Sequence, residues 1–139
     1  MIVLDTNVLS ELIRPNPSPA VLAWFDTQPA DRLATTAVTA GEMFAGVERL
    51  SAGRRRRALS DAVTVLLGAD FAGRVMPFDF AATGDYAAVM ATRQKAGRPM
   101  SVLDAQIAAI CRDRGARLAT RNTSDFEGTG VELINPWDA

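Results

Sequence analysis

Ile2-Val3-Leu4-Asp5-Thr6-Asn7 is the stretch that decides the fold, because a short apolar run ends there in a carboxylate and a helix-like pattern follows at once. An unbroken apolar run is typical of a strand in a parallel sheet that is covered on both faces. Ligands and ions collect at the carboxyl ends of the central strands in such sheets. Asp5 is therefore either a helix cap or the first residue of a charged site.

The composition is that of a globular domain. The chain has 139 residues, of which 48% are hydrophobic and 22% charged, and we expect one domain over residues 1–139 with its own core. The formal net charge of −1 argues against a broad surface that coats nucleic acid. We expect no membrane-spanning helix and no signal peptide, since no apolar run is long enough and Asp5 and Glu11 lie near the start. These features favour a cytoplasmic protein.

Histidine is absent, which removes several kinds of catalytic chemistry. Ser-His-Asp and Cys-His nucleophiles, histidine acid–base catalysis and histidine zinc sites are all excluded. The single cysteine, Cys111, excludes an intramolecular disulfide and lies in an apolar helical run typical of a buried core. If the protein is an enzyme, its carboxylates must carry the reaction.

Strand-like runs alternate with helix-like patterns along the whole chain. We expect strands near residues 2–4, 32–36, 74–78, 117–120 and 131–134, with helices between them. This order predicts an α/β protein: a three-layer α/β/α sandwich with a mostly parallel, about five-stranded sheet. Two of the helices begin with the form of a capping box, Thr39-Ala40-Gly41-Glu42 and Ser101-Val102-Leu103-Asp104.

Five polar residues follow strands or open helices, and a parallel sheet would bring them to one edge. Asp5 follows the first strand, Glu42 and Asp104 lie near helix starts, and Asn122 and Asp125 follow the fourth strand. Each acid alone is explained as readily by helix capping or by a turn. Together they would repel one another unless a hard divalent cation lay among them. Mg²⁺ and Mn²⁺ prefer such oxygen ligands, and either ion can activate water beside a phosphoryl group.

The local sequence at these positions resembles a known family. Leu4-Asp5-Thr6-Asn7 is similar to the first motif of PIN-domain ribonucleases, and Thr39-Ala40-Gly41-Glu42 with Gly46 is similar to the second. Residues 101–108 resemble the third motif and residues 119–126 the fourth. The closing Asn135-Pro136-Trp137 resembles the VapC and FitB branch of that family.

The resemblance implies a PIN-like fold and a toxin of a type II toxin–antitoxin pair, a Mg²⁺-dependent endoribonuclease with Mn²⁺ as the alternative ion. It implies that Asp5 and Asp104 are the main metal ligands, that Glu42 completes the acidic cluster and that the Thr6 hydroxyl supports it. Many members have an acid where this chain has Asn122, and Asp125 is the candidate for the missing charge. The implied partners are an RNA substrate, a VapB/FitA-like antitoxin and a second copy in a homodimer or a higher toxin–antitoxin assembly.

Three other interpretations compete with this one. A receiver-like protein would have adjacent acids after its first strand and a lysine late in the chain, but the one lysine here, Lys95, lies in the wrong context. An aspartyl phosphatase would have Asp-x-Asp, but here Asp5 is followed by Thr6-Asn7. A catalytically silent PIN-like module would only bind an antitoxin or RNA, and the presence of all three motif acids argues against it. The roles of two segments stay undecided. Arg54 to Arg57 form either a solvated turn or a contact with RNA or a partner. Trp24 and Phe25 lie either in the core or in a groove for the antitoxin.

Overall fold

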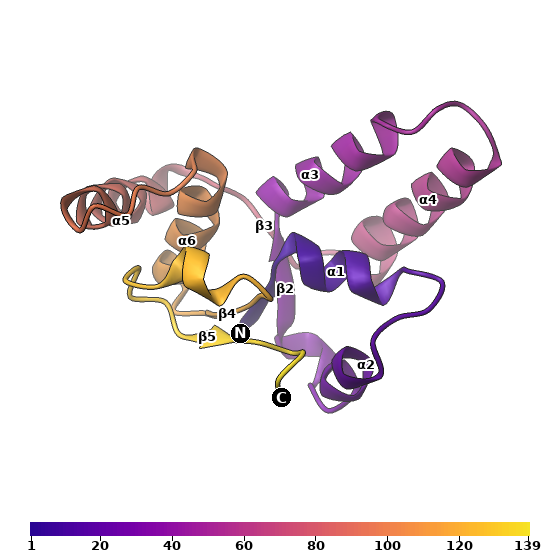
Figure 1. Cartoon of the computed structure of the whole chain (residues 1–139), viewed down its shortest axis with the longest axis horizontal. Coiled ribbons are helices and arrows are strands. Elements are labelled where there is room, and N and C mark those ends of the chain that lie inside the picture. Colours follow the sequence, from indigo (N-terminus) through magenta and orange to yellow (C-terminus); the bar gives the residue numbers. More distant parts are fainter.

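The computed structural model describes residues 1–139 and contains a five-stranded sheet in the order β3-β2-β1-β4-β5 (Figure 1). Every pair of neighbouring strands is parallel. The strands are short and comprise Ile2–Leu4 (β1), Leu33–Thr36 (β2), Val75–Met76 (β3), Arg117–Ala119 (β4) and Leu133–Ile134 (β5). The predicted parallel sheet, with the first strand at its centre, is confirmed.

Helices connect the strands. The α-helices comprise Thr6–Leu12 (α1), Pro19–Asp26 (α2), Ala37–Glu48 (α3), Arg54–Val65 (α4), Thr83–Lys95 (α5) and Val102–Arg114 (α6). Four shorter helical segments comprise Ala30–Arg32 (η1), Leu66–Asp70 (η2), Phe80–Ala82 (η3) and Thr123–Phe126 (η4). No helix is long and apolar enough to cross a membrane.

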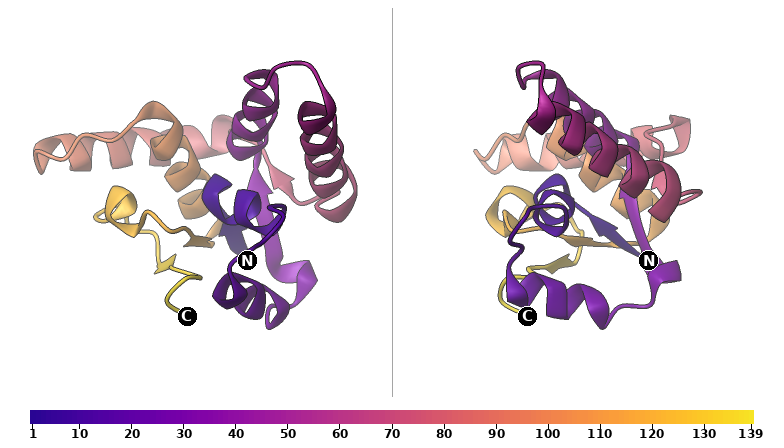
Figure 2. Two further views of the ribbon diagram at one scale, coloured as in Figure 1. Left: turned by 45° about the vertical axis from the view of Figure 1, so that its right-hand side comes forward. Right: turned by 90° about the vertical axis from the view of Figure 1, so that its right-hand side faces the viewer.

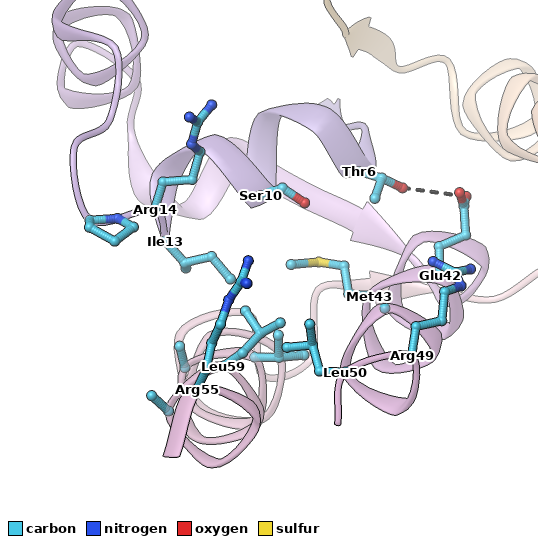
Figure 3. A pocket seen from close by; sticks show the side chains of 15 residues that line it. Thr6, Ser10, Ile13, Arg14, Glu42, Met43, Arg49, Leu50, Arg55 and Leu59 are labelled. Atoms are coloured by element: carbon cyan, nitrogen blue, oxygen red, sulfur yellow. Dashed lines mark hydrogen bonds between the residues drawn. The ribbon is translucent and has the colours of Figure 1, made fainter. Parts of the chain in front are cut away.

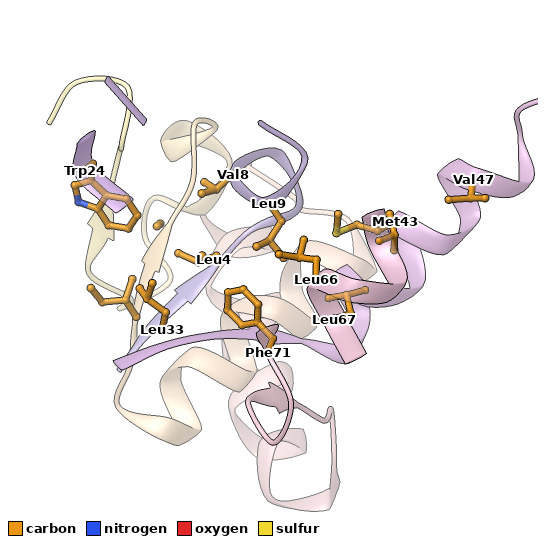
Figure 4. Close-up of a cluster of buried hydrophobic side chains, with 13 residues drawn as sticks. Leu4, Val8, Leu9, Trp24, Leu33, Met43, Val47, Leu66, Leu67 and Phe71 are labelled. Atoms are coloured by element: carbon orange, nitrogen blue, oxygen red, sulfur yellow. The ribbon is translucent and has the colours of Figure 1, made fainter. Parts of the chain in front are cut away.

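The alternation of side chains along β1 divides the core into two layers. Ile2 and Leu4 pack with residues of α1 to α4 in one buried cluster, which Figure 4 shows. Val3 points to the opposite face and packs with residues of α5 and α6, including Val89 and Ala108. Figures 1 and 2 show these two groups of helices on opposite sides of the sheet. The predicted three-layer α/β/α arrangement is therefore confirmed.

Several helix ends are set by the residues that the sequence supplies there. Ser101 caps α6 as predicted, its Oγ accepting from the Asp104 N–H at 3.1 Å. Gly115 ends α6 with a φ of 61°, a left-handed conformation that glycine adopts without a steric penalty. The helix predicted after Gly53 begins at Arg54.

The structure corrects some local predictions. The N-cap of α3 is Thr36, not Thr39, because the chain turns into the helix directly at the end of β2; the Thr36 hydroxyl accepts from the Thr39 N–H at 3.0 Å. Glu42 therefore lies in the second helical turn. Strand β3 ends at Met76, since Pro77 has no N–H for the next ladder bond. Trp24 is buried in the core, which rules out an exposed groove lined by that ring.

Candidate active site at the carboxyl edge of the sheet

Asp5 lies at the centre of this edge, directly after β1. Its backbone N–H continues the ladder to the Ala119 carbonyl of β4 at 3.0 Å, so the neighbouring strand holds its main chain. The side chain is 6% exposed and accepts hydrogen bonds on both oxygens. Oδ1 accepts from the Thr6 N–H at 2.8 Å, and Oδ2 accepts from the Thr120 hydroxyl at 2.8 Å. Asp5 is thus both the N-cap of α1 and a carboxylate fixed toward the edge.

Glu42 reaches the same edge from α3. The Thr6 hydroxyl lies 3.3 Å from Glu42 Oε1 and also 3.3 Å from the Thr39 Oγ1. Thr39 is completely buried, so the hydroxyls of Thr39 and Thr6 link α3 to the start of α1 beneath the surface. Thr6 therefore contacts the second acid through its side chain and the first through its N–H, which fits the supporting role predicted for it.

Asp104, Asn122 and Asp125 approach from the other side. Asp104 is half-buried in the first turn of α6. Asp125 is exposed on η4, and its charge acts on both Asp5 and Asp104. Asn122 is held by its backbone, whose N–H donates to the Thr120 Oγ1 at 3.1 Å, while its side chain is exposed. The Asp125 charge therefore raises the pKa of Asp5 and of Asp104, while Asn122 is joined to Asp5 only through the Thr120 hydroxyl.

The electrostatics tie the acids into one group. Burial raises the pKa of Asp5, against the hydrogen bond from Thr120, which lowers it. Burial and the nearby Asp5 charge raise the pKa of Glu42, and the same two causes raise the pKa of Asp104. Carboxylates that raise one another's pKa in this way favour either protonation or a bound cation.

The donor set fits a hard divalent ion that keeps part of its water. Every side chain of the cluster offers oxygen, and no histidine exists in the chain. No three acidic side chains are grouped closely enough to hold an ion by themselves. Mg²⁺ is commonly held by one or two carboxylates with several waters retained, so a close group of three acids is not required for it. The geometry does not resemble a Ca²⁺ cage, which takes six to eight oxygen ligands.

Two further residues contact Asp5 in the structure and were not predicted from the sequence, Thr120 and Asn7. The buried Thr120 hydroxyl donates to Asp5, accepts from the Asn122 N–H, and lies 3.3 Å from Asn7 Nδ2. The Asn7 Oδ1 in turn accepts from the Arg121 N–H at 3.1 Å. Thr120 and Asn7 together link the end of β1 to the segment that follows β4. Both lie within motifs that resemble the family, Asn7 in the first and Thr120 in the fourth, but nothing in either motif assigned them a contact with Asp5.

Replacing Thr120 by valine tests this connection. Thr120→Val keeps the shape but leaves Asp5 Oδ2 and the Asn122 N–H without their buried partner, so we expect a loss of about 1–3 kcal/mol in unfolding free energy. Loss of such a partner of a metal ligand also lowers metal affinity by roughly 10- to 100-fold. Urea denaturation and calorimetric Mn²⁺ titration measure the two effects. Thr120→Ser, which retains the hydroxyl, should stay close to the wild type; equal behaviour of the valine variant would refute the role.

A groove of about 730 Å³ leads away from this edge between α1, α3 and α4 (Figure 3). Thr6 and Glu42 lie at one end of it. Apolar side chains line it, among them Ile13 directly after α1, Met43 of α3 and Leu59 of α4. Three arginines join the lining: Arg14, Arg49 and Arg55. The Arg54 to Arg57 run therefore contributes Arg55 to the groove, while Arg56 is paired with Glu48 at 2.8 Å.

The protein is thus an α/β protein with an all-parallel sheet and a group of carboxylates at the carboxyl edge of that sheet. Such a site can bind a hard cation, and a hard cation can bind a phosphoryl group. The chain belongs to the PIN domain family, whose model matches residues 2–131. It is 42% identical over 138 residues to VapC ribonuclease Y4jK of Sinorhizobium fredii, with 99% of each chain covered. It is 34% identical over 137 residues to toxin FitB of Neisseria gonorrhoeae, again with 99% of each covered.

Solved structures agree with this assignment. The structure of FitAB bound to an IR36 DNA fragment contains a chain that is 35% identical, with a TM-score of 0.92 over 99% of this chain and 96% of the other. The resemblance to the VapC and FitB branch is therefore confirmed. The relatives named as ribonuclease and toxin support a nuclease of the toxin–antitoxin class, a family for which a divalent metal is the general cofactor.

Proposed function

We propose that the protein is a Mg²⁺-dependent endoribonuclease, the toxin of a type II toxin–antitoxin pair, which hydrolyses phosphodiester bonds in RNA. The observation that carries the proposal is the presence of Asp5, Glu42 and Asp104 at one edge of the sheet, where Thr6 joins Asp5 to Glu42 and the Asp5 charge adds to burial in raising the pKa of Glu42 and Asp104. Ionised carboxylates gathered in this way repel one another, and a cation would offset that repulsion. A divalent ion supplies positive charge for the phosphoryl oxygens and lowers the pKa of water.

The side chains divide the work by their positions. Asp5 and Asp104 would hold the ion, one from the strand edge and one from the first turn of α6. Glu42, oriented by the Thr6 hydroxyl, would accept a proton from the attacking water. Burial raises the pKa of Glu42, which makes its carboxylate a stronger base. Asn122 would orient water through its amide oxygen, and the Asp125 carboxylate would add the negative charge that many relatives carry at the position of Asn122.

The test uses purified protein freed of any antitoxin. Internally labelled RNA and single-stranded DNA of the same sequence are incubated with Mg²⁺, Mn²⁺, Ca²⁺ or EDTA. We expect internal cuts in RNA with Mg²⁺ or Mn²⁺ and none with EDTA. If folded protein that binds Mn²⁺ leaves RNA intact, the catalytically silent module becomes the better interpretation. Mapping cuts on total cellular RNA after brief expression then identifies the target.

The antitoxin is proposed to cover the groove between α1, α3 and α4. The apolar lining requires an occupant with apolar side chains, and Arg14, Arg49 and Arg55 favour acidic groups beside them. A VapB/FitA-like antitoxin segment lying there would reach Glu42 and so exclude RNA. The FitAB and VapBC structures similar to this chain are toxin–antitoxin complexes, several with DNA, which supports a larger assembly. A homodimer is proposed from the family resemblance.

A glycine on α3 provides a direct test of the groove. Gly46 lines it, and a Cβ at this position meets no atom within 4 Å, so a side chain can start there, and Gly46→Trp is designed to place its ring in the groove. Circular dichroism first establishes that the variant is folded. We expect antitoxin binding to weaken by about 1–3 kcal/mol, roughly 10- to 100-fold in Kd, because an inserted ring overpacks the interface. Gly41→Trp is the matched control, since Gly41 has equally open space on the same helix but does not line the groove. Equal affinities for the two variants in calorimetry would place the antitoxin elsewhere.

A further inference from the structure

Arg93, near the end of α5, is a buried cation that the proposed chemistry does not use. Its side chain is 6% exposed. The guanidinium donates from Nε to the Arg98 carbonyl at 2.7 Å and from Nη1 to the Glu127 carbonyl at 2.6 Å. Both contacts are short, as charged donors make them.

The pairing of Arg93 is unusual because it involves carbonyl oxygens rather than a carboxylate. The four ion pairs of the structure belong to Arg14, Arg56, Arg98 and Arg112, and none includes Arg93. Burying an arginine is costly unless its charge is compensated. The nearby acidic cluster provides that compensation in part, because Arg93 acts electrostatically on Asp104.

The two carbonyls belong to the two segments that carry the outer acids of the site. Arg98 lies in the turn between α5 and α6, three residues before the cap Ser101 and six before Asp104. Glu127 is the residue directly after η4, two residues beyond Asp125. One planar guanidinium therefore joins the segment that positions Asp104 to the segment that positions Asp125. No main-chain hydrogen bond outside the regular elements links these two segments directly.

Arg98 adds an outer layer to this junction. Its guanidinium donates to the Ser124 carbonyl at 2.9 Å and pairs with the Glu127 carboxylate at 3.2 Å. Both side chains of that ion pair are about half exposed, at 48% and 57%, so water and salt screen it. Arg93 is the buried member of the junction, and its two contacts are the ones that solvent does not replace.

We propose that Arg93 is a positioning residue that fixes Asp125 relative to Asp104 and so completes the metal site. This inference rests on the proposed metal-dependent function of the acidic edge. Arg93 touches neither substrate nor ion and acts only through the two backbone segments that it joins. A fork of two donors in one plane suits this role, and a lysine ammonium with one point charge does not reproduce it.

Replacing Arg93 by a neutral residue should change the metal affinity in opposite directions, depending on whether Arg93 acts by positioning the acids or only through its charge. Removing a cation beside the acids makes the cluster more negative, which by charge alone would tighten the binding of Mn²⁺. Loss of the junction would instead let Asp125 move away and weaken binding. Removal of an outer partner of a metal site typically costs 10- to 100-fold in affinity.

The experiment measures the Kd of Mn²⁺ by calorimetry for the wild type, Arg93→Met, Arg93→Lys and Arg112→Met, after circular dichroism has shown that each is folded. Arg112 is the control, because its Nη1 also donates to a carbonyl of this connection, that of Thr129 at 3.3 Å. It lies in the last turn of α6, whereas Asp104 lies in the first, and its charge is paired with Asp85. We expect Arg93→Met to weaken binding by roughly 10- to 100-fold, Arg93→Lys by less, and Arg112→Met by under about threefold. Unchanged or tighter binding in Arg93→Met overturns the proposal. If Arg93→Met does not fold, the same criterion is applied to Arg93→Lys.

A double-mutant cycle tests whether the effect passes through Asp125. Asp125→Asn is measured in the wild type and in Arg93→Lys; we expect its cost to be much smaller in the second background, since the carboxylate is already displaced. Additive costs overturn the proposal, as does a wild type that binds no Mn²⁺. Because the readout is metal binding, a wild type that binds Mn²⁺ without cutting RNA refutes the proposed function and leaves the inference about Arg93 to be decided by these affinities.

Discussion

Asp5→Asn is expected to reduce RNA cleavage by about 10³-fold, the largest effect of any single substitution in the chain. A metal ion contributes several kcal/mol of charge stabilisation in the transition state, and each 1.36 kcal/mol is a factor of ten in rate. The amide keeps the size of the side chain and retains an oxygen for the Thr6 N–H, which caps α1 at 2.8 Å. The loss therefore reports the missing charge and not an unfolded helix.

The measurement is the initial rate of cleavage of labelled RNA in Mg²⁺, with the protein free of antitoxin. Asp113→Asn is the matched control, because Asp113 is an exposed acid on α6, the helix that also carries Asp104, and lies at its opposite end. The control should cut at the wild-type rate. If Asp5→Asn cuts within tenfold of the wild type while remaining folded, Asp5 is only a helix cap and the metal-ligand role is lost.

The sequence was sufficient to predict the positions of the acids because parallel topology converts chain position into spatial proximity. Asp5 ends an apolar strand, and Asn122 and Asp125 follow another that pairs directly with it. Once the strands are parallel, these residues must share an edge. The alternation of strands and helices predicted the layers for the same reason, since each connection has to cross one face of the sheet.

Contacts between distant segments could not be predicted in this way. The hydroxyl of Thr120 meets Asp5 across 115 positions of the sequence, and nothing in the local pattern marks a threonine as completely buried. Arg93 resembles any polar residue on a helix that ends in Gln94-Lys95, and its burial depends on how the later connection folds over α5. The cap of α3 was misplaced by three residues because Thr39, with Glu42 three residues later, has the form of a capping box, whereas Thr36 does not. Thr36 is the cap because β2 ends there and the chain turns directly into the helix.

The choice left open for Trp24 and Phe25, core or groove, could not be made from the sequence for a related reason. Trp24 and Phe25 are large apolar residues on an early helix, which made them candidates for an exposed surface. In the fold, Trp24 packs in the cluster around β1, and the open groove is formed instead by the facing sides of α1, α3 and α4. Whether an apolar side chain lines a core or a groove depends on how closely neighbouring helices approach, which periodicity does not encode.

Removal of the metal should destabilise the fold more strongly as the pH rises. The folded protein raises the pKa values of Asp5 and Asp104 above their usual 3.8 and that of Glu42 above its usual 4.5. A carboxyl with a raised pKa binds its proton more tightly in the folded state, so its contribution to stability is fully present below the unfolded pKa. That contribution is lost as the pH rises from about 4 through the raised values. In EDTA, the melting temperature should therefore fall over this range as the acids ionise against one another.

Mg²⁺ should reverse this loss at pH 7.5 and have a smaller effect at pH 5, where protons compete for the same oxygens. An ion at one hundred times its Kd adds about 2.7 kcal/mol, which corresponds to roughly 10 °C in the melting temperature of a domain of this size. The triple variant Asp5→Asn, Glu42→Gln, Asp104→Asn is the control, because subtracting its curve removes the pH dependence of every other carboxyl. The melting temperature of the triple variant should not change with Mg²⁺, and its pH dependence should lack the contribution of these three acids. A wild type that melts at the same temperature in EDTA and in Mg²⁺ at pH 7.5 would show that these acids hold no ion.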